Sequence, residues 1–388
     1  MILALEIIFG ISALAMLHTY VFYPALLLLF SSAKKRELVY VAEDELPAIT
    51  IICAAYNEEK VIEEKVRSAF KTSYPAGKIT LSIGADACSD QTVAILQRLQ
   101  AEFPALKLHE FKQRTGKIGI LNQLVKEANG EVLVMTDANV YFKPETLFEL
   151  VKHFKDPAAG LVCGNIVKRP LNNEAVTSSE LQYMNFENRL KLAESNWMDV
   201  VLGAEGGCYA ARRGVIKEIP PHFIADDFFI TCLALRQKKK VIFEEKALAS
   251  EDLAADSQGE FRRKARIAAG NFQNLFYFSD ILARFWTPAA FAFLSHKVLR
   301  WKTPFLFLVN LIAAALLFKV HLFFRIVFFA ELGLLLLPLL NYLLVSVGVR
   351  IKLIIALSHF MLMNAALLTG FFRYCRGIKS SVWQPVKR

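Results

Sequence analysis

The sequence lacks the motifs that mark several large classes of nucleotide- and nucleic-acid-binding proteins. No GxGxxG follows the first strand-like run and no GxxxxGK[ST] occurs anywhere, which argues against a dinucleotide-binding or P-loop domain. Zinc-finger spacings, RNA-binding sheet motifs, internal repeats and low-complexity stretches are absent as well. We therefore expect no nucleic-acid partner, although the chain carries a formal net charge of +10.

Cysteine is scarce and scattered. The six cysteines form no CxxC pair and have no histidine at metal-binding spacing, so the sequence indicates neither a zinc site nor a disulfide scaffold. Cys53 and Cys163 lie inside strand-like apolar runs, where they fit as small core residues. This usage is typical of a reducing, cytosolic setting for the soluble part.

Apolar sequence, by contrast, is abundant. Hydrophobic residues make up 55% of the chain and the mean hydropathy is +0.36, which is too apolar for a purely soluble protein. The first thirty residues are almost entirely apolar, and a basic run over 34–36 follows at once. Because basic residues favour the cytoplasmic side, this pattern predicts a transmembrane anchor over 1–33 with the next domain in the cytoplasm.

Further apolar stretches predict three membrane segments within 302–373, ahead of a basic tail over 374–388. The stretches cover 303–318, 322–347 and 352–372. Alternating crossings would put the basic tail outside, so either one stretch is re-entrant or the tail is an exception to the positive-inside tendency. The pattern predicts a multi-pass protein of the inner (plasma) membrane, in contact with the lipid bilayer.

Residues 270–301 mix aromatic side chains with Arg284, Lys297 and Arg300. This composition predicts amphipathic helices that lie in the headgroup plane. A buried helix with a basic face is the alternative interpretation.

Strand-like and helix-like segments alternate within 47–269 and predict a cytoplasmic α/β domain with a mainly parallel sheet. Short, uncharged, β-branched runs indicate the strands, and amphipathic runs indicate the helices. Ser89 is placed to cap the helix over 90–103. The expected strands are 48–53, 78–84, 105–111 and 131–135.

Acidic residues follow several of these strands. Asp86 and Asp137 each come after a strand-like run, and the pair Asp226-Asp227 precedes a helix-like run. Carboxylates at the ends of parallel strands converge at one edge of a sheet. On a basic, membrane-tethered chain, they suggest divalent-metal and phosphate chemistry at a bilayer.

A series of short motifs carries a family resemblance. In order, AAYNEE, GADACSDQT, TGKIGILN, TDAN, ADDF and RRKARI resemble the motifs of inverting glycosyltransferases of family 2. The series is similar in particular to the membrane-embedded branch that contains cellulose, chitin, hyaluronan and poly-N-acetylglucosamine synthases. The resemblance spans about residues 47–270. It implies a GT-A-type domain, a hexosyltransferase activity and a nucleotide-sugar donor, UDP-sugar in most members.

The resemblance assigns nucleotide-sugar binding to the first loops. Tyr56, Asn57 and Glu58 match the loop that borders the base and ribose, and Asp86 matches the carboxylate that hydrogen-bonds the base. Lys117 matches a residue near the nucleotide. A helix-capping aspartate and a solvated lysine are the respective alternatives for Asp86 and Lys117.

The resemblance also implies a metal site. Asp137-Ala138-Asn139 occupies the position of the family's DxD, which holds Mg²⁺ or Mn²⁺ against the diphosphate. Asn139 departs from that pattern, because it offers a neutral amide oxygen instead of a carboxylate. The alternative for Asp137 is a turn residue at a strand end.

The acidic pair matches the family's catalytic carboxylates, with Asp227 as the general base that takes the acceptor hydroxyl proton. Asp226 also fits the N-cap of the helix that follows. Glu205, Gly206 and Gly207 match a loop that borders the donor sugar and acceptor together with Asp226. A turn that needs positive φ is the alternative for the glycines.

The last motif is altered. Arg263 and Arg266 lie where processive synthases carry QxxRW and are implied to bind the diphosphate, whereas Ile267 replaces the tryptophan that stacks on the acceptor sugar. A basic helix attracted to anionic lipid is the other interpretation. The acceptor is therefore expected to be a growing polysaccharide or a lipid. A catalytically degenerate membrane assembly subunit is the non-enzymatic alternative.

Overall fold

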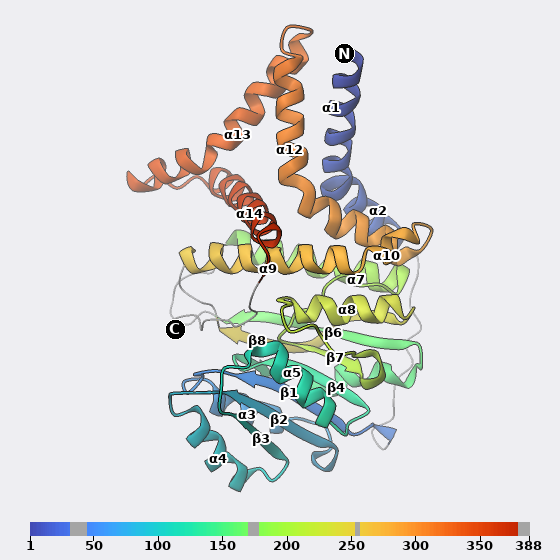
Figure 1. The fold of residues 1–388 in the computed structure, drawn as a ribbon, viewed down its shortest axis with the longest axis vertical. Coiled ribbons are helices and arrows are strands. Elements are labelled where there is room, and N and C mark those ends of the chain that lie inside the picture. The colour runs from blue at the N-terminus through green and yellow to red at the C-terminus, as the bar shows by residue number, and fades with distance from the viewer. Residues whose placement is uncertain (32–44, 170–177, 253–256, 379–388) are drawn as a thin grey trace. The chain divides into compact units, whose positions relative to one another are not determined.

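The computed structural model describes residues 1–31, 45–169, 178–252 and 257–378. The chain divides into two compact units (Figure 1). The helical unit comprises Met1–Leu26, Asp256–Tyr277 and Ala290–Gly377, and the sheet unit comprises Leu27–Ala255, Phe278–Ala289 and Ile378–Arg388.

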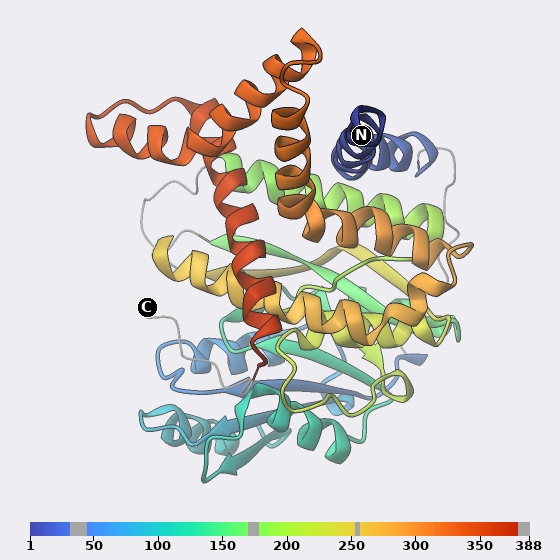
Figure 2. The ribbon, with the colours of Figure 1, turned by 45° about the horizontal axis from the view of Figure 1, so that its top comes forward.

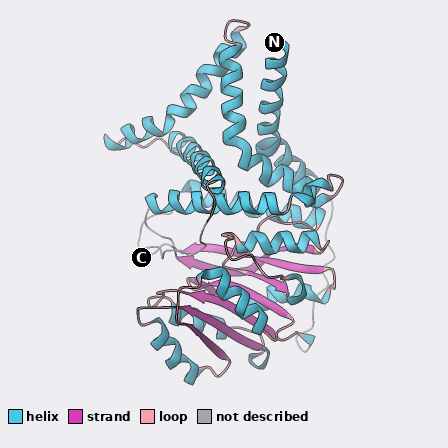
Figure 3. Cartoon of the chain, viewed as in Figure 1, coloured by secondary structure: helices cyan, strands magenta, loops and turns pink. Residues whose placement is uncertain are grey.

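The sheet unit is built on one eight-stranded sheet, whose strand order is β3-β2-β1-β4-β7-β6-β8-β5. The strands are drawn in magenta in Figure 3. The pairings along β3-β2-β1-β4 are parallel, β7 is antiparallel to both β4 and β6, β6 and β8 are parallel, and β5 is antiparallel to β8. The strands are β1 (Ile49–Ala55), β2 (Ile79–Asp86), β3 (Leu106–Phe111), β4 (Val132–Asp137), β5 (Val140–Phe142), β6 (Ala159–Arg169), β7 (Tyr209–Arg212) and β8 (Lys240–Asp252).

The predicted α/β fold is confirmed, and the four predicted strands correspond to the parallel half of the sheet. The other half is mixed, so the sheet as a whole is less parallel than expected. Strand-like burial patterns reveal that a segment is a strand but not the direction in which it enters the sheet. The direction of β7 therefore could not be read from its sequence.

Helices cover the sheet through apolar faces. In α3, Ile62, Val66 and Ala69 are fully buried, as the periodicity of this segment predicts. Each large apolar side chain buried in this way contributes about 1.5–3 kcal/mol. The helices of this unit are α3 (Ile62–Phe70), α4 (Thr92–Glu102), α5 (Gly116–Glu127), α6 (Thr146–Val151), α7 (Ser178–Met198), α8 (Asp226–Arg236) and α10 (Ser279–Ala283).

The start of α4 corrects one prediction. The first backbone N–H of the helix is satisfied by Asp90 and not by Ser89, because Asp90 Oδ1 accepts a hydrogen bond from the Thr92 backbone N–H at 3.0 Å. The hydroxyl of Ser89 instead accepts a hydrogen bond from the side-chain amide of Asn57 at 3.1 Å. Ser89 therefore connects two loops and does not cap the helix.

Helix α5 lies very close to β2. A Cβ atom on Gly84 would stand 2.3 Å from the Cγ2 atom of Ile120, so only glycine fits this position without a shift of the helix. The close approach brings the first turn of α5 to the carboxyl end of β2, where Asp86 is located.

The helical unit contains α1 (Ile2–Leu17), α9 (Ser257–Tyr277), α12 (Leu299–Leu316), α13 (Leu322–Ser346) and α14 (Lys352–Cys375), while α2 (Tyr23–Ser31) and α11 (Pro288–Ala292) cross its boundaries. Among the described residues, four helical stretches are long and apolar enough to cross a membrane. They are Ile2–Ser31, Pro288–Leu316, Leu322–Ser346 and Lys352–Cys375. The second stretch begins inside the segment predicted to hold interfacial helices, and the domain boundaries given above stay predictions.

Polar groups and small residues join the helices of this unit. Asn310 on α12 donates to the Phe9 carbonyl at 2.9 Å and to the Ser12 hydroxyl at 2.8 Å, both on α1. Helix α14, red in Figure 2, crosses α9. At Gly370 of α14, an added Cβ would lie 2.4 Å from the Cβ atom of Ala268 on α9. The ring pairs Phe272–Phe371 and Phe276–Tyr374 extend this contact.

Candidate active site

The candidate site lies at the carboxyl ends of the parallel strands. In the strand register, Ala54 of β1 is opposite Asp137 of β4, and Asp86 ends β2 beside Phe111 of β3. The loops after these strands therefore meet at one edge of the sheet, as expected for ligand sites in parallel sheets.

Asp86 is completely buried and is held by backbone groups. Its two carboxylate oxygens accept hydrogen bonds from the backbone N–H groups of Thr115 at 2.6 Å and Gly116 at 3.1 Å, at the start of α5. The Arg114 guanidinium lies 3.1 Å away. This arrangement balances the carboxylate charge at a helix N-terminus, so Asp86 positions α5 whatever else it contacts.

Arg114, which pairs with Asp86, also contacts the ring of Tyr56. The guanidinium carbon of Arg114 lies 3.3 Å from the centre of the Tyr56 ring, which is a cation–π contact. Sequence reasoning did not single out Arg114. Its signal was a basic residue in the loop before α5, three positions ahead of Lys117.

Asn57 and Glu58 shape the loop after β1. Asn57 has a left-handed backbone with φ of 52°, which asparagine tolerates better than most residues. Its side-chain oxygen accepts from the Ser89 backbone N–H at 2.9 Å, and the Glu58 backbone N–H donates to Thr92 Oγ1 at 2.8 Å. These bonds tie the first two strand-end loops together.

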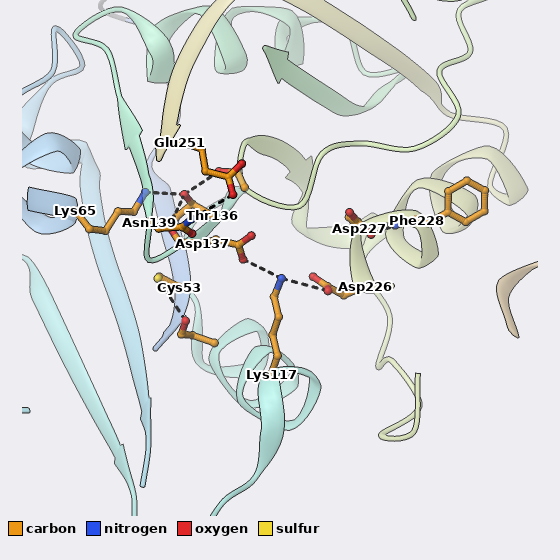
Figure 4. A network of polar contacts seen from close by, with 12 residues as sticks. Cys53, Lys65, Lys117, Thr136, Asp137, Asn139, Asp226, Asp227, Phe228 and Glu251 are labelled. Atoms are coloured by element: carbon orange, nitrogen blue, oxygen red, sulfur yellow. Dashed lines mark hydrogen bonds and ion pairs between the residues drawn. The ribbon is translucent and has the colours of Figure 1, made fainter. Parts of the chain in front are cut away.

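Lys117 connects the two acidic motifs (Figure 4). From the first turn of α5, its ammonium lies 2.9 Å from Asp137 Oδ1 and 3.3 Å from Asp226 Oδ1. Burial alone would lower the pKa of Lys117, but the neighbouring carboxylates raise it above its usual range. Lys117 is therefore a fixed cation between these two aspartates, and not a solvated lysine.

Asp226 does not cap α8, which corrects the capping interpretation. The helix begins at Asp226 itself, Ala225 holds the N-cap position, and Asp226 is only 4% exposed. A carboxylate buried to this extent needs a partner, and the Lys117 ammonium supplies it. Burial raises the pKa of Asp226, and Lys117 partly offsets that effect.

Asp227 follows in the first turn of α8 and keeps part of its surface exposed. Burial of its surroundings, together with the charge of Asp226, raises the pKa of Asp227 to about 7. A carboxyl group with such a pKa can exchange a proton near neutral pH.

The glycine loop lies against Asp227. A Cβ atom on Gly206 would stand 3.2 Å from Asp227 Oδ2, and one on Gly207 would stand 2.5 Å from Val140 Cγ2. Neither residue has positive φ, whereas Gly203 does. Gly207 is thus required for space, and the positive φ of the turn-forming alternative is found at Gly203 of the same loop and not at these two glycines. Glu205 of this loop forms an ion pair with Lys191 of α7.

Asp137 and Asn139 offer oxygen atoms at the end of β4. The Asp137 side chain is 41% exposed, and the Asn139 amide nitrogen donates to Glu251 Oε1 at 3.2 Å, which leaves its oxygen as acceptor. In the described part of the chain, no group of three or more His, Cys, Asp or Glu side chains forms a metal cage. Two oxygen donors fit a hard cation that takes its remaining ligands from phosphate and water.

Lys65 is a second lysine of this site, fully buried, and sequence reasoning missed it. Its ammonium donates to Thr136 Oγ1 and to the Val140 carbonyl, both at 2.6 Å (Figure 4). Burial lowers the pKa of Lys65 to about 8. The available signal was a lysine on the apolar face of α3, between Ile62 and Val66.

Arg263 and Arg266 belong to the helical unit, on α9. Arg263 is exposed, Arg266 is half-buried and Ile267 is exposed. Their predicted contacts with a diphosphate stay predictions.

Comparison with known proteins supports the family assignment. Residues 50–219 match the family model described as Glycosyl transferase family 2. A β-monoglucosyldiacylglycerol synthase of Trichormus variabilis is 34% identical over 132 residues, which cover 34% of this chain and 28% of that protein. A poly-β-1,6-N-acetyl-D-glucosamine synthase of Staphylococcus aureus is 28% identical over 123 residues, covering 31% of this chain and 29% of that protein. The chain thus matches less than a third of the length of these relatives.

A solved structure supports the fold. The mannosyltransferase PcManGT from Pyrobaculum calidifontis, in complex with GDP-Man and Mn²⁺, superposes with a TM-score of 0.71 at 22% identity, covering 96% of this chain and 99% of that one. The predicted GT-A-type fold and the predicted kinship are therefore confirmed. Residues 50–219 are a glycosyl transferase family 2 domain, and the enzyme class that this family defines is glycosyltransferase.

Proposed function

We propose that this protein transfers a sugar from a nucleotide diphosphate sugar, a UDP-sugar by the resemblance of its motifs, to a hydroxyl group, with inversion at the anomeric carbon. The observation that carries the proposal is the grouping of Asp137 and Asp226 around the Lys117 ammonium, with Asp227 next in the chain. Acidic groups held together at a strand-end edge suit a diphosphate leaving group on one side and proton transfer on the other.

Asp227 is proposed as the general base. It would accept the proton of the acceptor hydroxyl as that oxygen attacks the anomeric carbon from the face opposite the diphosphate. Its pKa of about 7 makes it a stronger base than an ordinary aspartate and leaves it ionised in mildly alkaline solution. Gly206 brings its backbone close to Asp227, because a Cβ atom there would stand only 3.2 Å from Asp227 Oδ2.

Asp137 and Asn139 would hold Mg²⁺ or Mn²⁺, which neutralises charge on the diphosphate when bound. Lys117 holds Asp137 and Asp226 in place and keeps positive charge between them. Tyr56, Asn57, Glu58 and Asp86 are proposed to border the nucleotide, with Arg263 and Arg266 binding the diphosphate.

The acceptor has two candidates. The wider branch with processive synthases favours a growing polysaccharide, as does the Staphylococcus aureus relative, whose name states a polymer product. A lipid acceptor is favoured by Ile267 in place of the stacking tryptophan and by the relative named for a glucosyldiacylglycerol product.

Four apolar helical stretches support a location of the protein in a membrane. We propose a multi-pass protein of the inner (plasma) membrane with its catalytic domain in the cytoplasm.

The test is nucleotide release by the purified full chain in liposomes, given a panel of nucleotide sugars with Mg²⁺ or Mn²⁺. Release with one donor that requires the cation, and that is lost in Asp227→Asn, is the expected result. The size of the labelled product then separates polymer from glycolipid. If the protein binds no nucleotide sugar of the panel and no nucleoside diphosphate, the proposed function is wrong.

A further inference from the structure

Lys65 is a buried lysine whose hydrogen-bond partners in the described part of the chain are neutral oxygens. Its side chain is 0% exposed, its ammonium contacts one hydroxyl and one backbone carbonyl, and it lies 3.9 Å from the centre of the Phe142 ring. Among the described residues, no acidic side chain forms an ion pair with it. Burying an ammonium without an anion opposes folding, so this arrangement requires an explanation.

Other buried lysines of the sheet unit behave differently. Lys152 is 3% exposed and pairs with Glu149 and with Glu244, the latter at 2.8 Å. Lys191 is 6% exposed and pairs with Glu205. Lys65 alone of these three has neutral oxygens as its hydrogen-bond partners.

The two contacts of Lys65 bracket the proposed metal-binding turn. Thr136 comes directly before Asp137, and Val140 comes directly after Asn139, so one ammonium fixes both ends of the turn. The Thr136 hydroxyl in turn donates to the Gly207 carbonyl at 2.9 Å. Through this hydroxyl, the turn is connected to the glycine loop that lies against Asp227.

We propose that Lys65 is a positioning residue, which holds the Asp137–Asn139 turn in the shape that binds a divalent cation with a nucleoside diphosphate. The proposal rests on the proposed function, and it adds a residue that contacts neither the cation nor the nucleotide. Its chemistry is that of a fixed donor: two hydrogen bonds from one rigid point prevent the turn from opening.

The competing explanation is that Lys65 only fills space under the sheet. A methionine has nearly the same length and no charge, so Lys65→Met separates the two. The matched control is Lys152→Met, which removes another buried lysine of the same unit, one that pairs with Glu149 and Glu244 and lies outside the proposed machinery. Thr136→Val removes the hydroxyl that joins Lys65 to Gly207 at almost constant volume.

The experiment measures the dissociation constants of UDP and of GDP for the full chain in detergent, with Mn²⁺ or with EDTA. The wild-type protein is expected to bind one nucleotide more tightly with Mn²⁺. Lys65→Met should lose on the order of 10–100-fold of the Mn²⁺-dependent affinity, as residues that support metal ligands do, with the affinity in EDTA unchanged. Lys152→Met should unfold at a lower temperature and keep the full Mn²⁺ effect.

The outcomes separate the two proposals. If Lys65→Met is folded and keeps the Mn²⁺ effect within about twofold of wild type, the role of Lys65 is wrong while the proposed function stands. If Lys65→Met does not fold, Thr136→Val decides, because a full Mn²⁺ effect in that variant overturns the proposal. If the wild-type protein binds neither nucleotide, the proposed function itself is wrong.

Discussion

Two acidic regions of the same sheet edge are treated in opposite ways by the fold. At the end of β2, the Asp86 carboxylate accepts two backbone hydrogen bonds and lies beside Arg114. At the end of β4 and the start of α8, Asp137 and Asp226 share Lys117, and Asp227 follows. In the first region one carboxylate has several hydrogen-bond donors, whereas in the second region two carboxylates share one ammonium.

The difference separates a carboxylate that stabilises the fold from carboxylates that are available for catalysis. A buried carboxylate with backbone N–H partners stabilises the elements that donate to it. Carboxylates that share a single cation repel one another, so they gain from binding a further cation or a proton. The β4/α8 region is therefore where a metal ion and an acceptor proton are expected, and the β2/α5 region is the frame that holds it.

The largest effect is expected from Asp227→Asn. The amide cannot accept the acceptor proton, so the turnover rate should fall about 10²–10⁴-fold, the usual contribution of general acid–base catalysis. Binding of the nucleoside diphosphate with Mn²⁺ should persist, and nucleotide release and equilibrium binding measure the two quantities. Residual turnover within tenfold of wild type would remove Asp227 from the mechanism.

Asp86→Asn tests the other region through stability. An asparagine accepts with one oxygen only and carries no charge for Arg114, so the free energy of unfolding should fall by about 1.5–3 kcal/mol. Thermal unfolding of the detergent-solubilised protein measures this loss. Asp90→Asn, at the more exposed start of α4, is the control and should cost well under 1 kcal/mol. Equal losses in both variants would contradict the assignment of Asp86 to the frame.

The pH dependence sharpens the assignment of Asp227. Because a general base must be ionised, the turnover rate should fall about tenfold per pH unit below a pKa of about 7 and reach a plateau above it.

The free energy of unfolding should depend on pH in the opposite direction and fall as pH rises. A carboxyl group whose pKa is raised on folding favours the folded state when protonated, so this group destabilises the fold as pH rises to 7. Asp227→Asn should therefore unfold at a higher temperature than wild type at pH 8, with a smaller difference at pH 5. A pH-independent difference would contradict this.

The smallest effect concerns Tyr209, which is fully buried beside the acidic region. Its hydroxyl has no hydrogen-bond partner among the described residues. Burial, followed by the charges of Asp226 and Asp227, raises its pKa. Tyr209→Phe removes an unsatisfied polar group and should stabilise the ligand-free protein by about 1 kcal/mol. A stability loss on chemical denaturation would show that the hydroxyl is satisfied.

The sequence predicted the frame of the fold well, because apolar periodicity and strand-end acids are local signals. The parallel strands, the apolar face of α3 and the position of Asp137 at a strand end follow from the pattern alone. The direction of β7 does not, since it depends on pairing between distant segments.

The site was less predictable, because its contacts join residues far apart in the chain. Capping propensity suggested a role for Asp226 at its own helix, whereas its actual partner is Lys117, on a different element. The role of Lys65 depends on contacts 71 and 75 residues away in the chain. A charged residue on an otherwise apolar helix face was the one local trace of that network.

Helices α9 and α14 pack closely against each other at Gly370, so we expect them to move together. Arg263 and Arg266 lie on α9, so a displacement of α14 carries both cations with it. Helix α14 is also a candidate membrane span, and spans tilt when bilayer thickness changes. A change in bilayer thickness that tilts α14 would therefore also move α9 and its two arginines.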